Sequence, residues 1–262
     1  TGAKIVLVDI DPDTYQMDPK LLEQAISPNT KAVIPVHLFG HPAPMDEIMS
    51  ICRPRGIKVI EDVAQAPNAM INGQCVGTIG DIGCYSFYPS KNLGCYGDGG
   101  AIVTNQPDLA GELKKLSDYG QSGRFNHEII GYNSRLDTLQ AAVLNTKMPH
   151  LSAWNEARRK VAVWYHTELQ NMDLKLPTEA SDAKCVYHLF VIQVDDRDEC
   201  LEYLHEKGIM AQIHYPSLIH LQPCYAHLGY GVGDFPVAEA AVSRILSLPM
   251  YPELTQEQVR VV

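Results

Sequence analysis

Short apolar runs alternate with helix-like segments over the first sixty residues of the chain. The apolar runs cover 4–9, 31–37 and 57–61, and each has the length of an ordinary strand. Helical patterns fill the intervals at 18–26 and 44–56. Strands separated by helices of about ten residues form βαβ units, so this order predicts an α/β fold built on a parallel sheet.

The rest of the chain divides into two parts. A long amphipathic helix pattern at 151–169 precedes a loop-like stretch at 177–184. We therefore expect a large domain over 1–149 and a compact α+β domain over 150–262. Further strands are expected at 82–87, 101–104, 186–194 and 210–214, and further helices at 107–119, 136–147, 197–207 and 235–246.

The composition narrows the class of partner. The 262 residues include 21 Lys and Arg against 31 Asp and Glu, and this net charge of −10 disfavours nucleic acid or an anionic membrane surface as main partner. No apolar run approaches the roughly 18–20 residues that span a bilayer, and the first residues do not resemble a signal peptide. Seven scattered cysteines without a CxxC pair predict reduced thiols in a cytoplasmic protein.

Asp62 directly follows an apolar strand, at the edge where ligands bind in open α/β sheets. Ala64 lies two positions further on and faces the same side if the chain is extended. A carboxylate that fixes a ring nitrogen, beside a small side chain that lets a flat ring approach, suits a heteroaromatic ligand. A role for Asp62 as the N-cap of a following helix is an equally open interpretation.

Lys91 stands in a loop between Pro89 and Gly94, just after another apolar strand. Its primary amine can form a Schiff base with a carbonyl where burial or a nearby cation lowers its pKa, although most lone lysines lie in solvent. Ser86, at the end of the strand, could donate to a phosphate oxygen. The glycines over 94–100 match neither nucleotide-binding glycine motif, so they indicate backbone that passes close to a bulky group.

Five stretches resemble the DegT/DnrJ/EryC1/StrS family of sugar aminotransferases, and together they run in the family's order over essentially the whole chain. The most specific is GDIGCYSFYPSKNLGCYGDGGAIVTN. The resemblance implies pyridoxal phosphate as cofactor and an aspartate-aminotransferase-like fold of type I, with a mostly parallel central sheet flanked by helices and a smaller C-terminal α+β domain. The stretches are 33–48, 61–66, 80–105, 131–144 and 214–239.

The resemblance also assigns roles to single residues. Lys91 would hold the cofactor covalently and then carry a proton between the substrate Cα and the cofactor. Asp62 would pair with the pyridine nitrogen and keep it protonated. Ala64 would lie against the ring, Gln65 would contact the phenolic oxygen, Ser86 would bind the phosphate, and Asn133 would reach the phosphate of the neighbouring subunit in a homodimer.

Three residues of the late segment are candidates for binding substrate. His214, Tyr215 and His220 fall in stretches that lie near the sugar side in the family; packing roles are equally open for each. The spacings of His188, His214 and His220 match no compact zinc pattern, so no metal site is expected. His188, inside an apolar strand, is interpreted as a core histidine.

The implied reaction is transamination of a nucleotide-linked keto-sugar to an amino-sugar, for cell-surface polysaccharide or secondary-metabolite synthesis, with glutamate as amino donor. The Tyr88-Pro89 pair favours a 3-keto-sugar. Dehydratase relatives carry His in place of the lysine, so Lys91 favours amino transfer, and no loop-borne Cys supports a desulfurase. A catalytically silent binding relative stays open, because the family's N-terminal phosphate-binding Gly-Thr helix has no counterpart here. The chain is therefore expected to be a fragment of a longer polypeptide.

Overall fold

A computed structural model describes residues 1–262. Its central sheet has the order β1-β2-β5-β6, formed by Ala32–Val33, Lys58–Asp62, Ile82–Ser86 and Gly100–Val103. The first three strands are parallel, and β6 is antiparallel to β5. The expected α/β class is therefore confirmed, with a mixed rather than wholly parallel sheet.

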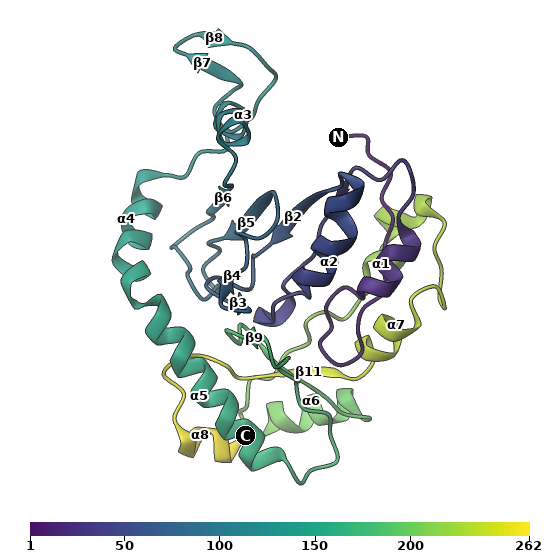
Figure 1. Ribbon diagram of the computed structural model, residues 1–262. Helices are drawn as coiled ribbons and strands as arrows, with labels where there is room; N and C mark the ends of the chain where they lie inside the picture. The colour runs from purple at the N-terminus through teal and green to yellow at the C-terminus, as the bar shows by residue number, and fades with distance from the viewer.

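Two helices pack against this sheet and follow their sequence signals. Asp18 caps α1 (Pro19–Ala25) by accepting from the amides of Lys20 and Leu21. The α2 helix (Met45–Cys52) continues as a 3₁₀ turn, η2 (Arg53–Arg55), because the ring of a proline in that turn disrupts the α-helical hydrogen bonds. In Figure 1, α2 lies beside β2. Apolar side chains of both helices and of β1 and β2 form the first core, which also takes in Val186.

A second core lies in the C-terminal half. The 19-residue helix α5 (Leu151–Leu169) packs on α8 (Gln256–Val261) and on the antiparallel pair β10 (Phe190–Gln193) and β11 (Ile245–Leu248). Figure 1 shows α8 beside the lower end of α5. Stacking of Tyr165 on Phe190, with ring centroids 4.8 Å apart, joins the helix to the strands. The domain boundary at 149/150 stays a prediction.

A hairpin arm projects away from both cores, at the top of Figure 1. It consists of β7 (Gln121–Gly123) and β8 (Asn126–His127), and it follows helix α3 (Pro107–Ser117). The chain then returns through α4 (Thr138–Lys147) to α5. The arm thus forms an extension whose side chains are largely exposed.

The remaining elements are short. A three-stranded antiparallel sheet of order β4-β3-β9 joins the two halves of the chain. Its strands β3 and β4 follow Asp62 in the first half, and β9 belongs to the C-terminal half. No helix of the structure combines the length and the apolar character needed to cross a membrane. These elements are β3 (Met70–Ile71), β4 (Gln74–Cys75), β9 (Ala183–Lys184), α6 (Arg197–Glu206), α7 (Pro236–Val242), η1 (Leu38–Gly40), η3 (Met148–His150), η4 (Ile219–Leu221) and η5 (Pro223–Leu228).

Two of the expected elements are wrong and a third is too long. The runs 4–9 and 210–214 form no strand, because a strand needs a continuous ladder and here only the isolated bridges of Ile10 and Gln212 form. The helix expected over 235–246 ends at Val242, and the next residues are strand β11. Pairing with β10 buries all four residues of that strand, which outweighs the helical periodicity.

Candidate active site

The carboxyl ends of two neighbouring strands bring the main candidates to one edge of the sheet. Asp62 ends β2 and Ser86 ends β5, and the parallel register places Asp62 opposite Cys84. Oδ1 of Asp62 accepts from the amide of Ala64 at 2.9 Å, whereas Oδ2 has no hydrogen-bond partner in the chain. No helix follows Asp62, so the N-cap interpretation is wrong and one carboxylate oxygen is left for a ligand.

Lys91 lies in the loop after β5, half-buried, with its amide donating to the carbonyl of Tyr88 at 2.9 Å. Its Nζ makes no hydrogen bond within the chain. Burial lowers the pKa of the Lys91 ammonium, and the nearby charge of Asp62 opposes that shift. The amine is therefore partly desolvated and electrostatically coupled to the carboxylate at the end of the adjacent strand.

Two histidines lie within the electrostatic reach of Lys91. Burial lowers the pKa of His214, and the charge of Lys91 acts in the same direction. Burial also lowers the pKa of His188 to about 3, aided by Lys91, Arg158 and His214. These imidazoles come from the C-terminal half of the chain, so both halves contribute to the surroundings of the amine.

Gln65 connects the EDVAQA motif with the late HYP segment. Its Oε1 accepts from the amide of Phe39 at 2.6 Å, and its Nε2 donates to the hydroxyl of Tyr215 at 3.0 Å. The structure therefore joins Gln65, expected at the cofactor, to Tyr215, expected at the substrate. Nδ1 of the preceding His214 lies 2.9 Å from Oγ of Ser247.

His220 occupies a different environment from the other two substrate candidates. Its side chain is buried, and its Nε2 lies 3.1 Å from Oε1 of Glu239 on α7. Glu239 also accepts from the amides of Gly233 and Phe235. His220 thus anchors the segment between Tyr215 and α7, while its ring faces the interior.

Asn133 is the one cofactor candidate that the fold sets apart. It lies at the base of the hairpin arm, bridged to Asp118, and is exposed. No hydrogen bond connects it with the Lys91 loop of the same chain. Arg135, two residues on, donates to Asp118 at 2.6 Å and covers the ring of Tyr119.

Buried polar residues next to these candidates escaped the sequence analysis. Asn92, Asn155 and Arg158 are all buried, although polar side chains next to a lysine or on an amphipathic helix suggest solvent exposure. The three-residue spacing of Asn155 and Arg158 places them on one helix face. This spacing was the one sequence feature that could have indicated their shared burial. Glu61 and His37 are also completely buried.

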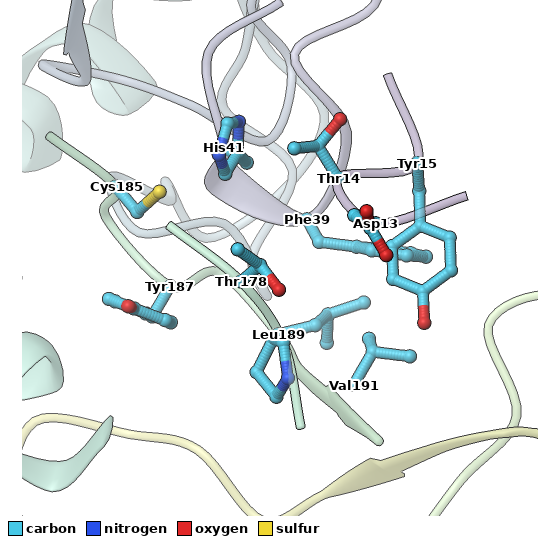
Figure 2. Close-up of a pocket in the computed structure, with 11 residues that line it drawn as sticks. Asp13, Thr14, Tyr15, Phe39, His41, Thr178, Cys185, Tyr187, Leu189 and Val191 are labelled. Carbon is cyan, nitrogen blue, oxygen red and sulfur yellow. The ribbon is translucent and has the colours of Figure 1, made fainter. Parts of the chain in front are cut away.

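A small cavity lies apart from this edge. Its volume of about 30 Å³ suits one water molecule, and Figure 2 shows Phe39 pointing toward Tyr15 in its wall. None of the expected site residues lines it. The cavity is too small for a cofactor, so the candidate site remains the strand-end edge.

The donor set at that edge fits pyridoxal phosphate, which has a basic ring nitrogen, an aldehyde and a phosphate. Oδ2 of Asp62 can accept a hydrogen bond from the protonated ring nitrogen, and the half-buried amine of Lys91 can attack the aldehyde. The hydroxyl of Ser86, whose oxygen accepts from the amide of Tyr88 at 3.3 Å, keeps its own proton for a phosphate oxygen. No three His, Cys, Asp or Glu side chains gather in a way that could hold a metal ion.

The sequence matches the model of the DegT/DnrJ/EryC1/StrS aminotransferase family over residues 1–262. It is 48% identical over 258 residues to UDP-N-acetyl-3-dehydro-alpha-D-glucosamine 3-aminotransferase of Acidithiobacillus ferrooxidans, covering 98% of this chain and 69% of that protein. It is also 48% identical over 260 residues to a pleiotropic regulatory protein of Geobacillus stearothermophilus, covering 98% and 70%. The fold matches the crystal structure of S. venezuelae DesV in complex with a ketimine intermediate with a TM-score of 0.94 and 42% identity, covering 97% of this chain and 69% of DesV.

Proposed function

The chain belongs to the DegT/DnrJ/EryC1/StrS aminotransferase family, and we propose that it transfers an amino group to C3 of a nucleotide-linked 3-keto-sugar. Pyridoxal phosphate is the cofactor. The Acidithiobacillus relative, by its name, acts at C3 of a UDP-linked sugar, which supports the preference drawn from Tyr88-Pro89. Glutamate is proposed as donor, and synthesis of polysaccharide or secondary-metabolite sugars in the cytoplasm as context.

The observation that carries this proposal is the convergence of Lys91 and Asp62. A half-buried primary amine in the loop after β5 and a carboxylate with one free oxygen at the end of β2 lie close enough for the charge of Asp62 to act on the pKa of Lys91. Transamination needs both groups: an amine that binds a carbonyl and moves a proton, and an anion that holds a ring nitrogen in its protonated form.

Pyridoxal phosphate, when bound, supplies an electron sink for the charge that remains after a proton leaves Cα. Asp62 is proposed to hold the proton on the ring nitrogen through Oδ2. Nζ of Lys91, which has no partner within the chain, is proposed to take the proton from the substrate Cα and deliver it to C4′ of the cofactor, two bonds away. Ser86 would orient the phosphate, Ala64 would leave room at the ring face, and Gln65 would face the phenolic oxygen.

A second copy of the chain is the proposed partner. Three apolar side chains of the arm and of α4 lie in solvent, with 94% of Ile130, 80% of Leu139 and 79% of Phe125 exposed. Large exposed apolar groups on a projecting element and on the helix that follows it are typical of an interface. Asn133 lies on the same arm, so a homodimer would allow it to reach the phosphate in the neighbouring subunit.

The test is the reaction of the purified chain with pyridoxal phosphate, glutamate and a panel of nucleotide-linked 3-keto- and 4-keto-sugars. We expect a visible absorption band that borohydride removes, followed by amination of a 3-keto-sugar. Amination of 4-keto-sugars alone would overturn the C3 assignment. A chain that stays colourless would favour a catalytically silent regulatory role, and the name of the Geobacillus relative describes that protein as regulatory. Loss of water without amino transfer would favour a dehydratase.

A further inference from the structure

The residue directly after Lys91 is the centre of a buried hydrogen-bond network. Nδ2 of Asn92 donates to Oδ1 of Asn155 at 2.9 Å and to the carbonyl of Val186 at 3.0 Å. Oδ1 of Asn92 lies 3.1 Å from Nδ1 of His188. All the polar atoms of this amide are therefore engaged, and the contacts reach two segments that lie 63 to 96 positions away in the sequence.

The partners of Asn92 are themselves held in place. Nδ2 of Asn155 donates to the carbonyl of Pro67 at 3.0 Å, in the turn that follows Gln65. One helical turn further along α5, Nη1 of Arg158 donates to the carbonyls of Tyr187 and Met250 at 3.2 and 2.9 Å. The network thus links the turn after Asp62, the Lys91 loop, α5 and the start of β10.

The protonation of His188 follows from these contacts. Because Nδ2 of Asn92 donates to two acceptors, its Oδ1 is the acceptor toward His188, and the proton of the neutral imidazole lies on Nδ1. Nε2 then carries a lone pair and has no partner in the chain. The charges of Lys91, Arg158 and His214 act on this ring, and all of them disfavour an imidazolium.

The direction of the Lys91 side chain depends on the loop that carries it. Its Nζ has no hydrogen bond, so its position depends on the backbone of the loop over 88–95. That backbone is held by the turn from Lys91 to Tyr88, by the amide of Cys95 donating to Phe87 at 2.9 Å, by Nζ of Lys147 on α4 donating to the carbonyl of Gly94 at 2.6 Å, and by the side chain of Asn92. Only the last of these contacts ties the loop to the C-terminal half.

We propose that Asn92 and His188 form a positioning pair, which holds the Lys91 loop against the C-terminal half and so sets where the Lys91 amine lies relative to Asp62. This inference rests on the proposed role of Lys91 in transamination. Neither member needs to touch cofactor or substrate. Nδ1–H of His188 makes the hydrogen bond that holds the loop, whereas Nε2 is not needed for this positioning.

Amide substitutions separate the two ring nitrogens. In His188→Asn the amide N–H replaces Nδ1–H and Nε2 is removed, whereas in His188→Gln the amide lies near the place of Nε2 and the donor to Asn92 is lost. Asn92→Ala removes the other member of the pair. The readout is the titration of Lys91 by NMR in the full chain without added pyridoxal phosphate, after reductive ¹³C-methylation, with Lys91→Arg to assign the signal. This readout does not depend on turnover.

In the unsubstituted chain and in His188→Asn, we expect Lys91 to titrate below the other lysines. In His188→Gln and Asn92→Ala, the amine should move toward solvent and its pKa should rise toward the ordinary value of about 10.4. Circular dichroism verifies that each variant is folded, and the two His188 variants suffice if Asn92→Ala does not fold. Unchanged titration in folded His188→Gln, or an equal shift in His188→Asn, would overturn the proposal. Failure of transamination alone, with these titrations as expected, would contradict only the proposed function.

Discussion

Nε2 of His37 lies 3.1 Å from Oε2 of Glu61, and neither side chain is exposed to solvent. The amide of Ala43 donates to Nδ1 of the same imidazole at 2.8 Å, so the ring proton is on Nε2 and a neutral His37 donates to the carboxylate. Burial opposes ionisation of Glu61, yet its hydrogen bonds lower its pKa overall. The other donors are the amides of Gly77, Ile79 and Gly80, at 2.6, 2.8 and 2.6 Å.

Glu61→Gln should lower the free energy of unfolding by about 3 kcal/mol, because a buried acceptor becomes a donor that faces N–H groups. Urea unfolding measures the change. Glu23→Gln removes an exposed carboxylate that pairs with Arg55, and it should cost about 1 kcal/mol or less. Equal costs for the two variants would show that the buried hydrogen bonds of Glu61 add no more to stability than an exposed ion pair does.

Lys91→Ala should lower turnover by about 10⁴-fold or more, since it removes both the amine that binds the cofactor and the group that moves the proton. Steady-state rates with the accepted keto-sugar measure this loss. Lys20→Ala, at an exposed position of α1, should retain full activity. Near-normal turnover of the Lys91 variant would show that Lys91 is not a catalytic residue.

Asp62→Asn should lower turnover by about a hundredfold or more, because a neutral amide no longer holds the proton on the ring nitrogen. Cofactor absorption should persist, since Lys91 is intact. Asp173→Asn, an exposed acid outside the helices and strands, is the matched control. If both variants turn over substrate at the same rate, Asp62 has no role at the nitrogen.

His188 should make the chain less stable as the pH falls from 7 to 5. Its pKa is about 3 in the folded chain against about 6.5 when unfolded, so the unfolded state binds the extra proton over this interval. Stability then falls with decreasing pH, by about 2 kcal/mol at pH 5. In His188→Asn this part of the pH dependence should vanish from urea titrations, and a slope equal to that of the unsubstituted chain would show that His188 is not buried as a neutral group.

Ile130→Glu combined with Leu139→Glu should dissociate the proposed homodimer, because charges replace the exposed apolar side chains of the arm and α4. Light scattering with size-exclusion chromatography measures the molar mass. Val232→Glu changes a side chain that is 85% exposed in the late loop, and it should leave the mass unchanged. A monomer before substitution would contradict the dimer itself.

The sequence by itself determined the fold class, the family, the strand-end location of Asp62 and Ser86 and the loop position of Lys91. Each of these follows from local patterns: apolar runs at strand length, a capped helix start at Asp18, and motifs confined to a few consecutive residues. The strongly periodic helix at 151–169 was predicted at its observed bounds, because periodicity over many residues outweighs a single tertiary contact.

Only the tertiary structure decided which polar residues are buried and what they contact. Asn92, Asn155 and His188 lie far apart in sequence, and nothing in their neighbouring residues indicates that they meet. Packing places hydrogen-bonding atoms of Asn155 and His188 at 2.9 and 3.1 Å from the amide of Asn92. Tertiary contacts also explain strand β11: its sequence has a helical pattern, but its residues pair with β10 instead. Burial and strand pairing depend on residues that are distant in sequence and adjacent in space, so the local propensity of a segment does not predict them.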